Sequence, residues 1–330
     1  MINPKQNLSD KIFKKDIDMA PTRQGYGEGL VLAGEKDEKV VVLCADLTDS
    51  TKSAAFKEKF PDRFIEVGVA EQGMATIAAG MANYGKIPFI SSYAAFSPGR
   101  NWEQIRTTIA LNDVPVKIAG AHAGVSVGPD GATHQMLEDI ALMRAMPNMI
   151  VINPADAIQA SKATSAAAAN GKPTYLRFAR EATPIFTNDK TPFKIGKIET
   201  LWESDDPQVA IIATGPLVYE ALKAAKELSK SIDCLVLNCH TIKPIDEIAV
   251  IRAAKTCGAV VTIEEHQITG GLGGAVAEVL GKNFPTPIEI LGMPDCFGES
   301  GQPDELLAKY GMKAVNIIDS VKKVVARKSD

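Results

Sequence analysis

Several residue types with distinctive chemistry are scarce or scattered in this chain of 330 residues. The five cysteines are odd in number and include no Cys-x-x-Cys pair, which argues against a zinc site or a disulfide framework and predicts buried thiols in a reducing compartment. With a net charge of −4, there is no basic field of the kind that holds nucleic acid. No apolar run approaches the roughly 18 residues that span a bilayer, and the polar N-terminus lacks a signal core. We therefore expect a cytoplasmic protein with no membrane or nucleic-acid partner.

Short apolar runs alternate with helical segments along the chain. Strands are expected over residues 40–44, 116–119, 149–152, 174–178, 209–213, 234–237 and 259–263. Helices are expected over residues 71–83, 101–111, 155–169, 217–229, 275–280 and 315–326. This alternation predicts an α/β fold of two sequential domains, each a mostly parallel sheet covered by helices. Functional loops are then expected at the carboxyl ends of the strands.

The pattern also predicts where the domains begin and end. The stretch 183–207 holds Pro184, Pro192, mixed charge and few apolar runs, which is typical of a linker. We therefore expect an N-terminal extension over 1–20, a first domain over 21–182, the linker, and a second domain over 208–330. In the second domain, Gly270-Gly-Leu-Gly-Gly274 lacks the spacing of a phosphate-binding loop and favours a tight strand-to-helix turn.

The most site-like stretch is Gly128-Pro-Asp-Gly-Ala-Thr-His-Gln135. It carries Asp130 and His134 between glycines, and a second of the chain's four histidines, His122, precedes it. Further upstream, Gly68-Val-Ala-Glu-Gln72 places Glu71 in the first turn of an expected helix. Each feature alone is also compatible with a structural role, either a loop histidine or a carboxylate at a helix start. Together they indicate a functional site at one edge of an α/β sheet.

These motifs resemble those of transketolases. The matching segments, in the family's order and approximate spacing, are Ala45-Asp-Leu-Thr48, Gly68-Val-Ala-Glu-Gln72, Asp130-Gly-Ala-Thr-His-Gln135, Arg177-Phe-Ala-Arg180 and Glu264-Glu-His266 with the glycines that follow it. The resemblance begins near Thr22 and continues to the end of the chain. It implies a pyrimidine-binding domain followed by a transketolase C-terminal domain, which is the second half of a full-length enzyme and is similar to one chain of a transketolase split into two subunits.

The resemblance implies thiamine diphosphate as the cofactor. Glu71 would hydrogen-bond N1′ of the aminopyrimidine and act in catalysis together with His134. The other implied cofactor contacts are Tyr93, Phe96, Asp46 and Leu47. The family's third pyrimidine-enclosing aromatic has no counterpart, because the segment Gly99-Arg-Asn-Trp102 departs from the pattern.

The metal ligands of the family are missing from this sequence. Thiamine-diphosphate enzymes hold the diphosphate through a divalent cation and a Gly-Asp-Gly segment followed by Asn, and no Gly-Asp-Gly occurs here. The resemblance therefore implies that Mg²⁺ is ligated by a partner chain, an N-terminal transketolase subunit with the diphosphate-binding domain. It also implies a homodimer core within a heterotetramer, and no activity for this chain alone.

The resemblance further implies sugar-phosphate substrates. Arg23, Ser50, His122 and Arg180 would bind the acceptor phosphate, and Asp130 and His134 would contact sugar hydroxyls. Arginine suits phosphate because its rigid donors match pairs of oxygens. Arg100 and Arg177 are further candidate anion contacts. The implied reaction transfers a two-carbon ketol unit from a ketose phosphate to an aldose phosphate, as in the pentose phosphate pathway.

Three alternatives stay open from the sequence. Deoxyxylulose-phosphate synthases share an Asp-Gly-x-Thr-His-Gln motif, although Ala45-Asp-Leu-Thr48 with Ser50 favours transketolase. The β subunits of 2-oxoacid dehydrogenases have a similar length and a Glu-Gln pair, but typically lack Asp-Gly-x-Thr-His. A catalytically silent scaffold or regulatory subunit is the alternative from another class, and an intact Glu71 with both histidines argues against it.

Overall fold

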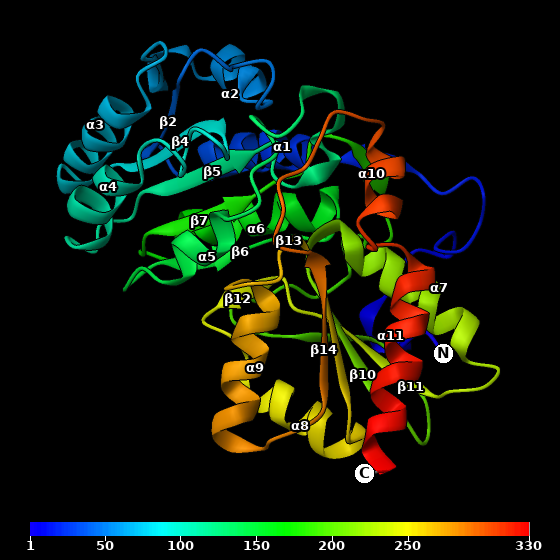
Figure 1. The fold of residues 1–330 in the computed structure, drawn as a ribbon. Coiled ribbons are helices and arrows are strands. Elements are labelled where there is room, and N and C mark those ends of the chain that lie inside the picture. The colour runs from blue at the N-terminus through cyan, green and yellow to red at the C-terminus, as the bar shows by residue number, and fades with distance from the viewer. Residues whose placement is uncertain (330) are drawn as a thin grey trace.

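The computed structural model describes residues 1–329, and its first half is built on a seven-stranded sheet (Figure 1). The sheet order is β12-β6-β7-β5-β4-β2-β3, and all neighbouring pairs are parallel except β12 with β6. The strands are β2 (Val40–Cys44), β3 (Phe64–Glu66), β4 (Ile87–Tyr93), β5 (Lys117–Ala121), β6 (Ile150–Ile152), β7 (Thr174–Arg177) and β12 (Thr241–Lys243). Strands β2, β5 and β7 are buried along their whole length, and β2 is accordingly a continuous apolar run.

Helices cover this sheet. They are α1 (Thr22–Lys36), α2 (Ala54–Lys59), α3 (Glu71–Asn83), α4 (Trp102–Gln104), α5 (Asp139–Arg144) and α6 (Ala157–Ala169). Glycine lets α1 approach the alanine-rich α6 closely, because a Cβ on Gly25 would lie 1.8 Å from the carbonyl oxygen of Ala157. The helix expected over 101–111 begins as α4 and continues as a π-helix, η3 (Ile105–Ala110).

The second half is built on a five-stranded sheet in the order β14-β13-β10-β11-β9, parallel except for β9 with β11. Its strands are β9 (Glu199–Trp202), β10 (Val209–Ala213), β11 (Cys234–Asn238), β13 (Val260–Gln267) and β14 (Ile288–Met293). Its helices are α7 (Val218–Leu228), α8 (Glu247–Cys257), α9 (Leu272–Asn283), α10 (Pro303–Lys309) and α11 (Ala314–Ala326). Helices α8 and α9 cover one face and α7 and α11 the other (Figure 1). The predicted fold class, two sequential α/β domains with mostly parallel sheets, is confirmed.

Segments of each half pack or pair with the other half, which the sequence does not suggest. The segment 183–207, expected to be a linker, contains β9, so the second sheet begins before residue 208. The expected extension 1–20 packs on the second half, where Ile2 bridges Trp202 and Ile12 joins the core. It also contributes β1 (Met19–Pro21), which pairs with β8 (Ala182–Pro184). Strand β12 of the second half extends the first sheet. The domain limits given above stay a prediction.

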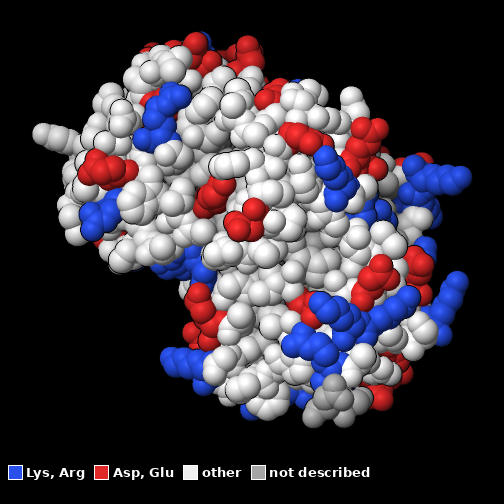
Figure 2. Space-filling view, in the orientation of Figure 1, with Lys and Arg blue, Asp and Glu red and all other residues white. Residues whose placement is uncertain are grey.

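The surface and the cysteines complete the description. Cys44, Cys234, Cys239 and Cys257 are buried as expected, but the expectation is wrong for Cys296, which is exposed. Both signs of charge are interspersed over the face shown in Figure 2, with Lys and Arg gathering at the lower right, where α11 lies in Figure 1. Within residues 1–329, no helix has the length and apolar character needed to cross a membrane.

Candidate active site

The predicted site residues follow the carboxyl ends of five neighbouring parallel strands, β7, β5, β4, β2 and β3. Asp46, Leu47 and Ser50 follow β2; Glu71 follows β3; Tyr93 ends β4 and Phe96 follows it; His122, Asp130 and His134 follow β5; Arg180 follows β7. Because the carboxyl ends of parallel strands meet at one edge of a sheet, residues far apart in sequence collect there. Arg23 joins them from the first turn of α1.

The four residues predicted to bind phosphate lie together around Arg23. Its Nη1 donates to the carbonyl oxygen of Ser50 at 2.6 Å and lies 3.5 Å from Nε2 of His122. Its Nε donates to the carbonyl oxygen of Arg180 at 3.2 Å, and Arg180 in turn donates to the carbonyl oxygen of Val127 at 2.7 Å. Ser50 thus meets the cluster through its backbone, which the sequence does not reveal.

This cluster concentrates positive charge around a neutral imidazole. Burial, followed by the charges of Arg23, Arg180 and His134, lowers the pKa of His122 to about 3. Burial and the neighbouring Arg180 also lower the pKa of Arg23. His122 has a left-handed backbone (φ 55°), and its Nδ1 is buried without a hydrogen-bond partner. Two guanidinium groups and an unpartnered imidazole nitrogen form an environment that favours an anion.

An aromatic series leads away from the phosphate cluster. The rings of His122 and Tyr93 stack with centroids 3.8 Å apart, and Tyr93 stacks on Phe96 at 5.9 Å with an interplanar angle of 20°. His134 presents its edge to both rings, with centroids 6.2 Å from Tyr93 and 5.6 Å from Phe96. Such flat, partly buried ring faces are suited to enclosing a planar heterocycle.

Glu71 lies at the other end of this series, at the start of α3. Its carboxylate is nearly inaccessible (side chain 2% exposed) and forms an ion pair with Arg100, with 2.8 Å between Oε2 and Nη1. The guanidinium of Arg100 also lies over the ring of Phe96, 4.8 Å from its centroid. Asn101 donates from Nδ2 to the carbonyl oxygen of Glu71 at 3.0 Å. No sequence motif indicates this role for Asn101, and the sequence suggested Arg100 only as an anion contact.

Asp46 and Leu47 belong to a loop that Glu66 organises. The Glu66 carboxylate accepts hydrogen bonds from the backbone nitrogen of Asp46 at 2.8 Å, the hydroxyl of Thr48 at 2.9 Å and the backbone nitrogen of Gly68 at 3.1 Å. Asp46 is exposed with φ 58°, and Leu47 is half-buried. Glu66 therefore links the loops after β2 and β3. It was missed because it ends a three-residue strand with no motif of its own.

Asp130 and His134 lie on the loop after β5. Asp130 ends the short helix η4 (Val125–Asp130) and is exposed. His134 is half-buried, and its Nδ1 lies 2.9 Å from the hydroxyl oxygen of Thr133. The loop therefore carries an exposed carboxylate and, four residues later, an imidazole that contacts the rings of Tyr93 and Phe96. Among the residues that the structure describes, no hydrogen bond or ion pair joins Asp130 to the phosphate cluster.

The second half of the chain supports this loop. The segment between β14 and α10 rises against the first half in Figure 1. Its Glu299 carbonyl oxygen accepts a hydrogen bond from Nε2 of Gln135 at 2.9 Å. At Gly131, where φ is 73°, an added Cβ would lie 2.7 Å from Oγ of Ser300. The C-terminal domain thus fixes the position of the loop that carries Asp130 and His134.

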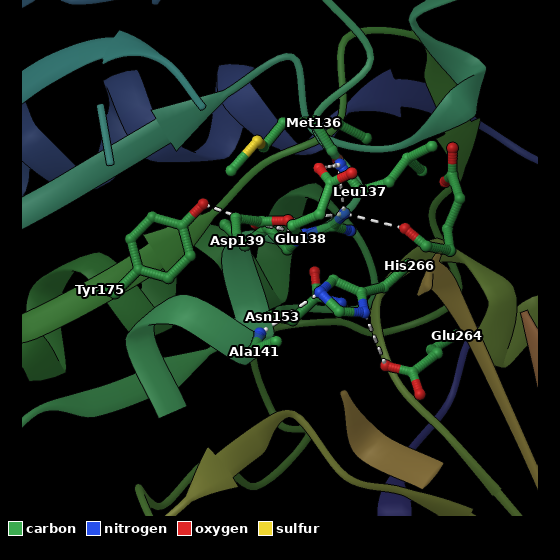
Figure 3. A network of polar contacts seen from close by, with 12 residues as sticks. Met136, Leu137, Glu138, Asp139, Ala141, Asn153, Tyr175, Glu264 and His266 are labelled. Atoms are coloured by element: carbon green, nitrogen blue, oxygen red, sulfur yellow. Dashed lines mark hydrogen bonds and ion pairs between the residues drawn. The ribbon is translucent and has the colours of Figure 1, made fainter. Parts of the chain in front are cut away.

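The motif Glu264-Glu-His266 lies in the second half and connects it to the first half. Glu264 accepts hydrogen bonds from the backbone nitrogens of Leu272 and Gly273 at the start of α9. Backbone N–H groups at a helix start can bind an anion, and here the carboxylate of Glu264 takes that place. His266 accepts from the backbone nitrogen of Ala141 at 3.3 Å (Figure 3). The tight-turn interpretation of the glycine cluster therefore agrees with the structure.

Arg177, considered above as an anion contact, belongs to the same buried network. Figure 3 shows Tyr175 and Asp139 on one side of this network and His266 and Glu264 on the other. Arg177 bonds Asp139 and donates to the carbonyl oxygen of Glu265 at 2.8 Å. It is 2% exposed, so it supports the site and does not face it.

Comparison with known families identifies both halves of the fold. Residues 18–185 match the transketolase pyrimidine-binding domain, and residues 196–317 match the transketolase C-terminal domain. The chain belongs to the transketolase family.

Its relatives include chains of similar length. It is 46% identical to a putative transketolase C-terminal section of Methanocaldococcus jannaschii, with 89% of this chain and 93% of the relative covered. It is 41% identical to a 6-deoxy-6-sulfo-D-fructose transketolase subunit of a Clostridium species, with 93% and 95% covered. A solved split-gene transketolase, described as an inactive β4 tetramer, superposes with a TM-score of 0.87 at 43% identity, with 93% and 99% covered. The chain thus corresponds to the C-terminal section of a split transketolase.

Proposed function

We propose that this chain is the pyrimidine-binding subunit of a thiamine-diphosphate-dependent transketolase in cytoplasmic carbohydrate metabolism. With a partner that carries the diphosphate-binding domain and Mg²⁺, it transfers a two-carbon ketol unit from a ketose phosphate to an aldose phosphate. The observation that carries the proposal is the continuous series from Arg23 through His122, Tyr93 and Phe96 to the buried Glu71. An anion site and a carboxylate beside aromatic rings lie at its two ends, as this reaction requires.

The residues at the Glu71 end fit an aminopyrimidine. The guanidinium of Arg100, which is flat, cationic and rich in N–H donors, lies over Phe96 and bonds Glu71. An aminopyrimidine with a protonated N1′ is likewise flat, cationic and a donor of N–H hydrogen bonds. In this proposal Glu71 bonds N1′, Tyr93 and Phe96 enclose the ring, and Asp46 and Leu47 line the neighbouring loop.

Each residue then has a task in the reaction. Thiamine diphosphate supplies a nucleophilic thiazolium carbon and an electron sink for the two-carbon unit. Glu71 holds or shares a proton at N1′, which favours the imino form of the aminopyrimidine, and its burial suits that role. Asp130 and His134 orient the sugar hydroxyls near the reacting carbons. Arg23, Arg180, His122 and the Ser50 loop hold the phosphate.

Self-association uses the exposed side of α3. Three large apolar side chains are exposed in and beside this helix: Val69 (69% exposed) before it, Ile77 (47%) within it and Tyr84 (92%) directly after it. Gly73 and Gly80 leave open space beside them, so a second helix can approach closely. Exposed apolar groups beside glycines favour a helix-on-helix contact with a second copy of this chain. We therefore propose a homodimer core, flanked by two partner chains in a heterotetramer.

Reconstitution tests the proposal. The chain is assayed alone and after mixing with an N-terminal transketolase subunit, thiamine diphosphate and Mg²⁺. Activity on xylulose phosphate with ribose phosphate is expected only in the mixture. Pyruvate with glyceraldehyde phosphate tests synthase chemistry, and 6-deoxy-6-sulfo-D-fructose as donor tests whether a sulfonate replaces the phosphate. Inactivity of the mixture on every sugar donor would overturn the transferase assignment.

The isolated chain provides a second test of partner dependence. It is expected to sediment as a dimer or larger oligomer and to bind thiamine diphosphate weakly, because the diphosphate and Mg²⁺ contacts belong to the partner. Equilibrium titration checks this. A Mg²⁺-dependent Kd near 1 μM, about −8 kcal/mol, for the chain alone would contradict the division of the cofactor site.

A further inference from the structure

Arg100 connects the protein surface to the most buried part of the site. Its side chain is 46% exposed, whereas the Glu71 side chain that it pairs with is 2% exposed. Its guanidinium lies over the ring of Phe96 and donates to Oε2 of Glu71. The backbone at this point is fixed, because the Arg100 nitrogen donates to the Phe96 carbonyl oxygen and Gly99 admits no Cβ, which would lie 2.1 Å from the Ala95 carbonyl oxygen. Only the side chain is free to move.

Two groups cannot use the same carboxylate and ring face at once. An aminopyrimidine bound as proposed above would take both the ring face of Phe96 and the carboxylate of Glu71. A guanidinium never gives up its proton in a protein, so Glu71 is held as a carboxylate while the pair lasts. The proposed role of Glu71 requires a proton held or shared with N1′. The ion pair with Arg100 and the proposed bond to N1′ therefore compete for the same carboxylate.

We propose that Arg100 is an internal occupant of the pyrimidine site, which pairs with Glu71 in the cofactor-free chain and is displaced when the aminopyrimidine binds. This inference rests on the proposed function for the assignment of Glu71 and Phe96. It accounts for the departure of the segment 99–102 from the family's third pyrimidine-enclosing aromatic: this segment supplies a displaceable cation in place of a fixed wall. It also explains how a buried carboxylate is compensated before the cofactor arrives.

Cofactor binding to the reconstituted complex tests the displacement. Arg100→Ala removes the competitor, so the Kd of thiamine diphosphate in the presence of Mg²⁺ is expected to fall about tenfold, the lower end of the range for one charged hydrogen bond. Arg106→Ala is the matched control, because it removes an exposed arginine of the adjoining segment that forms no ion pair among the described residues. It is expected to leave the Kd unchanged. An unchanged or weaker affinity for Arg100→Ala overturns the proposal, and weaker binding would make Arg100 part of the cofactor's wall.

Thermal unfolding of the cofactor-free full chain provides a readout that needs no turnover. Arg100→Ala leaves Glu71 buried and unpaired, so its Tm is expected to fall, and Glu71→Gln added to it is expected to restore part of the loss. If Arg100→Ala does not fold, Arg100→Gln, which keeps the side-chain length without the charge, takes its place in both experiments. Equal Tm values for the single and double variants overturn the pairing.

Failure of this inference differs from failure of the proposed function. If Glu71 is not the cofactor's partner, Glu71→Gln alone leaves cofactor affinity and turnover at wild-type values. If only the displacement is wrong, Glu71→Gln still impairs the complex while Arg100→Ala fails to tighten cofactor binding.

Discussion

Asp139 and Arg177 form an ion pair that is almost completely removed from water. Nε of Arg177 lies 2.7 Å from Oδ2 of Asp139, with side chains 3% and 0% exposed. The hydroxyl of Tyr175 donates to the same carboxylate oxygen at 2.6 Å. Since Arg177 also bonds the Glu265 carbonyl oxygen, the pair connects the first sheet to β13 of the C-terminal domain. The two halves that carry the candidate site are thus held together by a buried charge network.

Removing one partner of this pair is expected to be costly. Asp139→Asn leaves the guanidinium of Arg177 buried without a counter-charge, so the free energy of unfolding should fall by about 3–5 kcal/mol. Tyr175→Phe is the matched control, because it removes one neutral donor from the same carboxylate and should cost less, about 1.5–3 kcal/mol. Urea unfolding of the full chain measures both. Similar losses for the two variants would show that the ion pair contributes no more to the free energy of unfolding than the single hydrogen bond from Tyr175.

The pH dependence of stability should report on His122. Its folded-state pKa is about 3, below the ordinary value of about 6.5. As pH falls through 6.5, the unfolded chain therefore binds a proton at His122, whereas His122 in the folded chain stays neutral. The contribution of His122 to the free energy of unfolding is therefore fully present above pH 6.5 and decreases as pH falls below that value. Between pH 7 and pH 5 the loss should reach roughly 2 kcal/mol.

Comparison with a non-titrating variant isolates this contribution. In denaturant unfolding at pH 7, 6 and 5, the stability of wild type relative to His122→Gln should decrease by roughly 2 kcal/mol over the range. All other titrating groups are common to both proteins. A constant difference across the three pH values would mean that His122 takes up its proton as readily in the folded protein as in the unfolded chain.

The sequence predicted the elements whose cause is local. Strands Val40–Cys44 and Val209–Ala213 and helix Glu71–Asn83 begin and end where expected, because each is an apolar run or an amphipathic segment with its own boundaries. Strands β9 and β12 are among those that were not predicted, as are the parallel strands β3, β4 and β14. Strands β9 and β12 are antiparallel edge strands whose partners are distant in sequence, so only tertiary pairing makes them strands.

The site shows the same division. Its predicted residues lie at one edge of the sheet. They belong to motifs that follow strands, and the carboxyl ends of all strands in a parallel sheet meet at the same edge. Contacts between different loops were not predicted, because they produce neither a periodic pattern nor a motif in the sequence. Examples are Glu66 with Asp46, Arg100 with Glu71, and the carbonyl oxygen of Ser50 with Arg23. The supporting role of Glu299 and Ser300 was equally invisible, because it depends on how the second domain docks.

Substitution of Glu71 tests the catalytic assignment. Glu71→Gln keeps the size of the side chain and one hydrogen bond but cannot exchange a proton with N1′. Turnover of the reconstituted complex should fall by roughly two to four orders of magnitude, the range for loss of positioned proton transfer. Circular dichroism and sedimentation of the variant verify that the fold and assembly persist. A loss of about tenfold or less would remove Glu71 from the proposed role.

Substitution of Arg180 separates phosphate binding from cofactor chemistry. Arg180 lies beside Arg23 and at the far end of the aromatic series from Glu71, so its proposed contact is with a phosphate remote from the broken bond. Arg180→Ala should therefore raise KM for phosphorylated acceptors far more than it lowers kcat. Loss of one charged hydrogen-bonding partner is worth about 1.5–3 kcal/mol, or roughly 10- to 150-fold in kcat/KM.

An acceptor without phosphate provides the internal control for Arg180. Glycolaldehyde cannot use the arginine cluster, so wild type and Arg180→Ala should use it almost equally well in steady-state assays of the complex. Arg180 also donates to the carbonyl oxygen of Val127, next to the loop that carries Asp130. If both acceptors lose activity to the same extent, the arginine acts through that loop, and the phosphate is bound elsewhere.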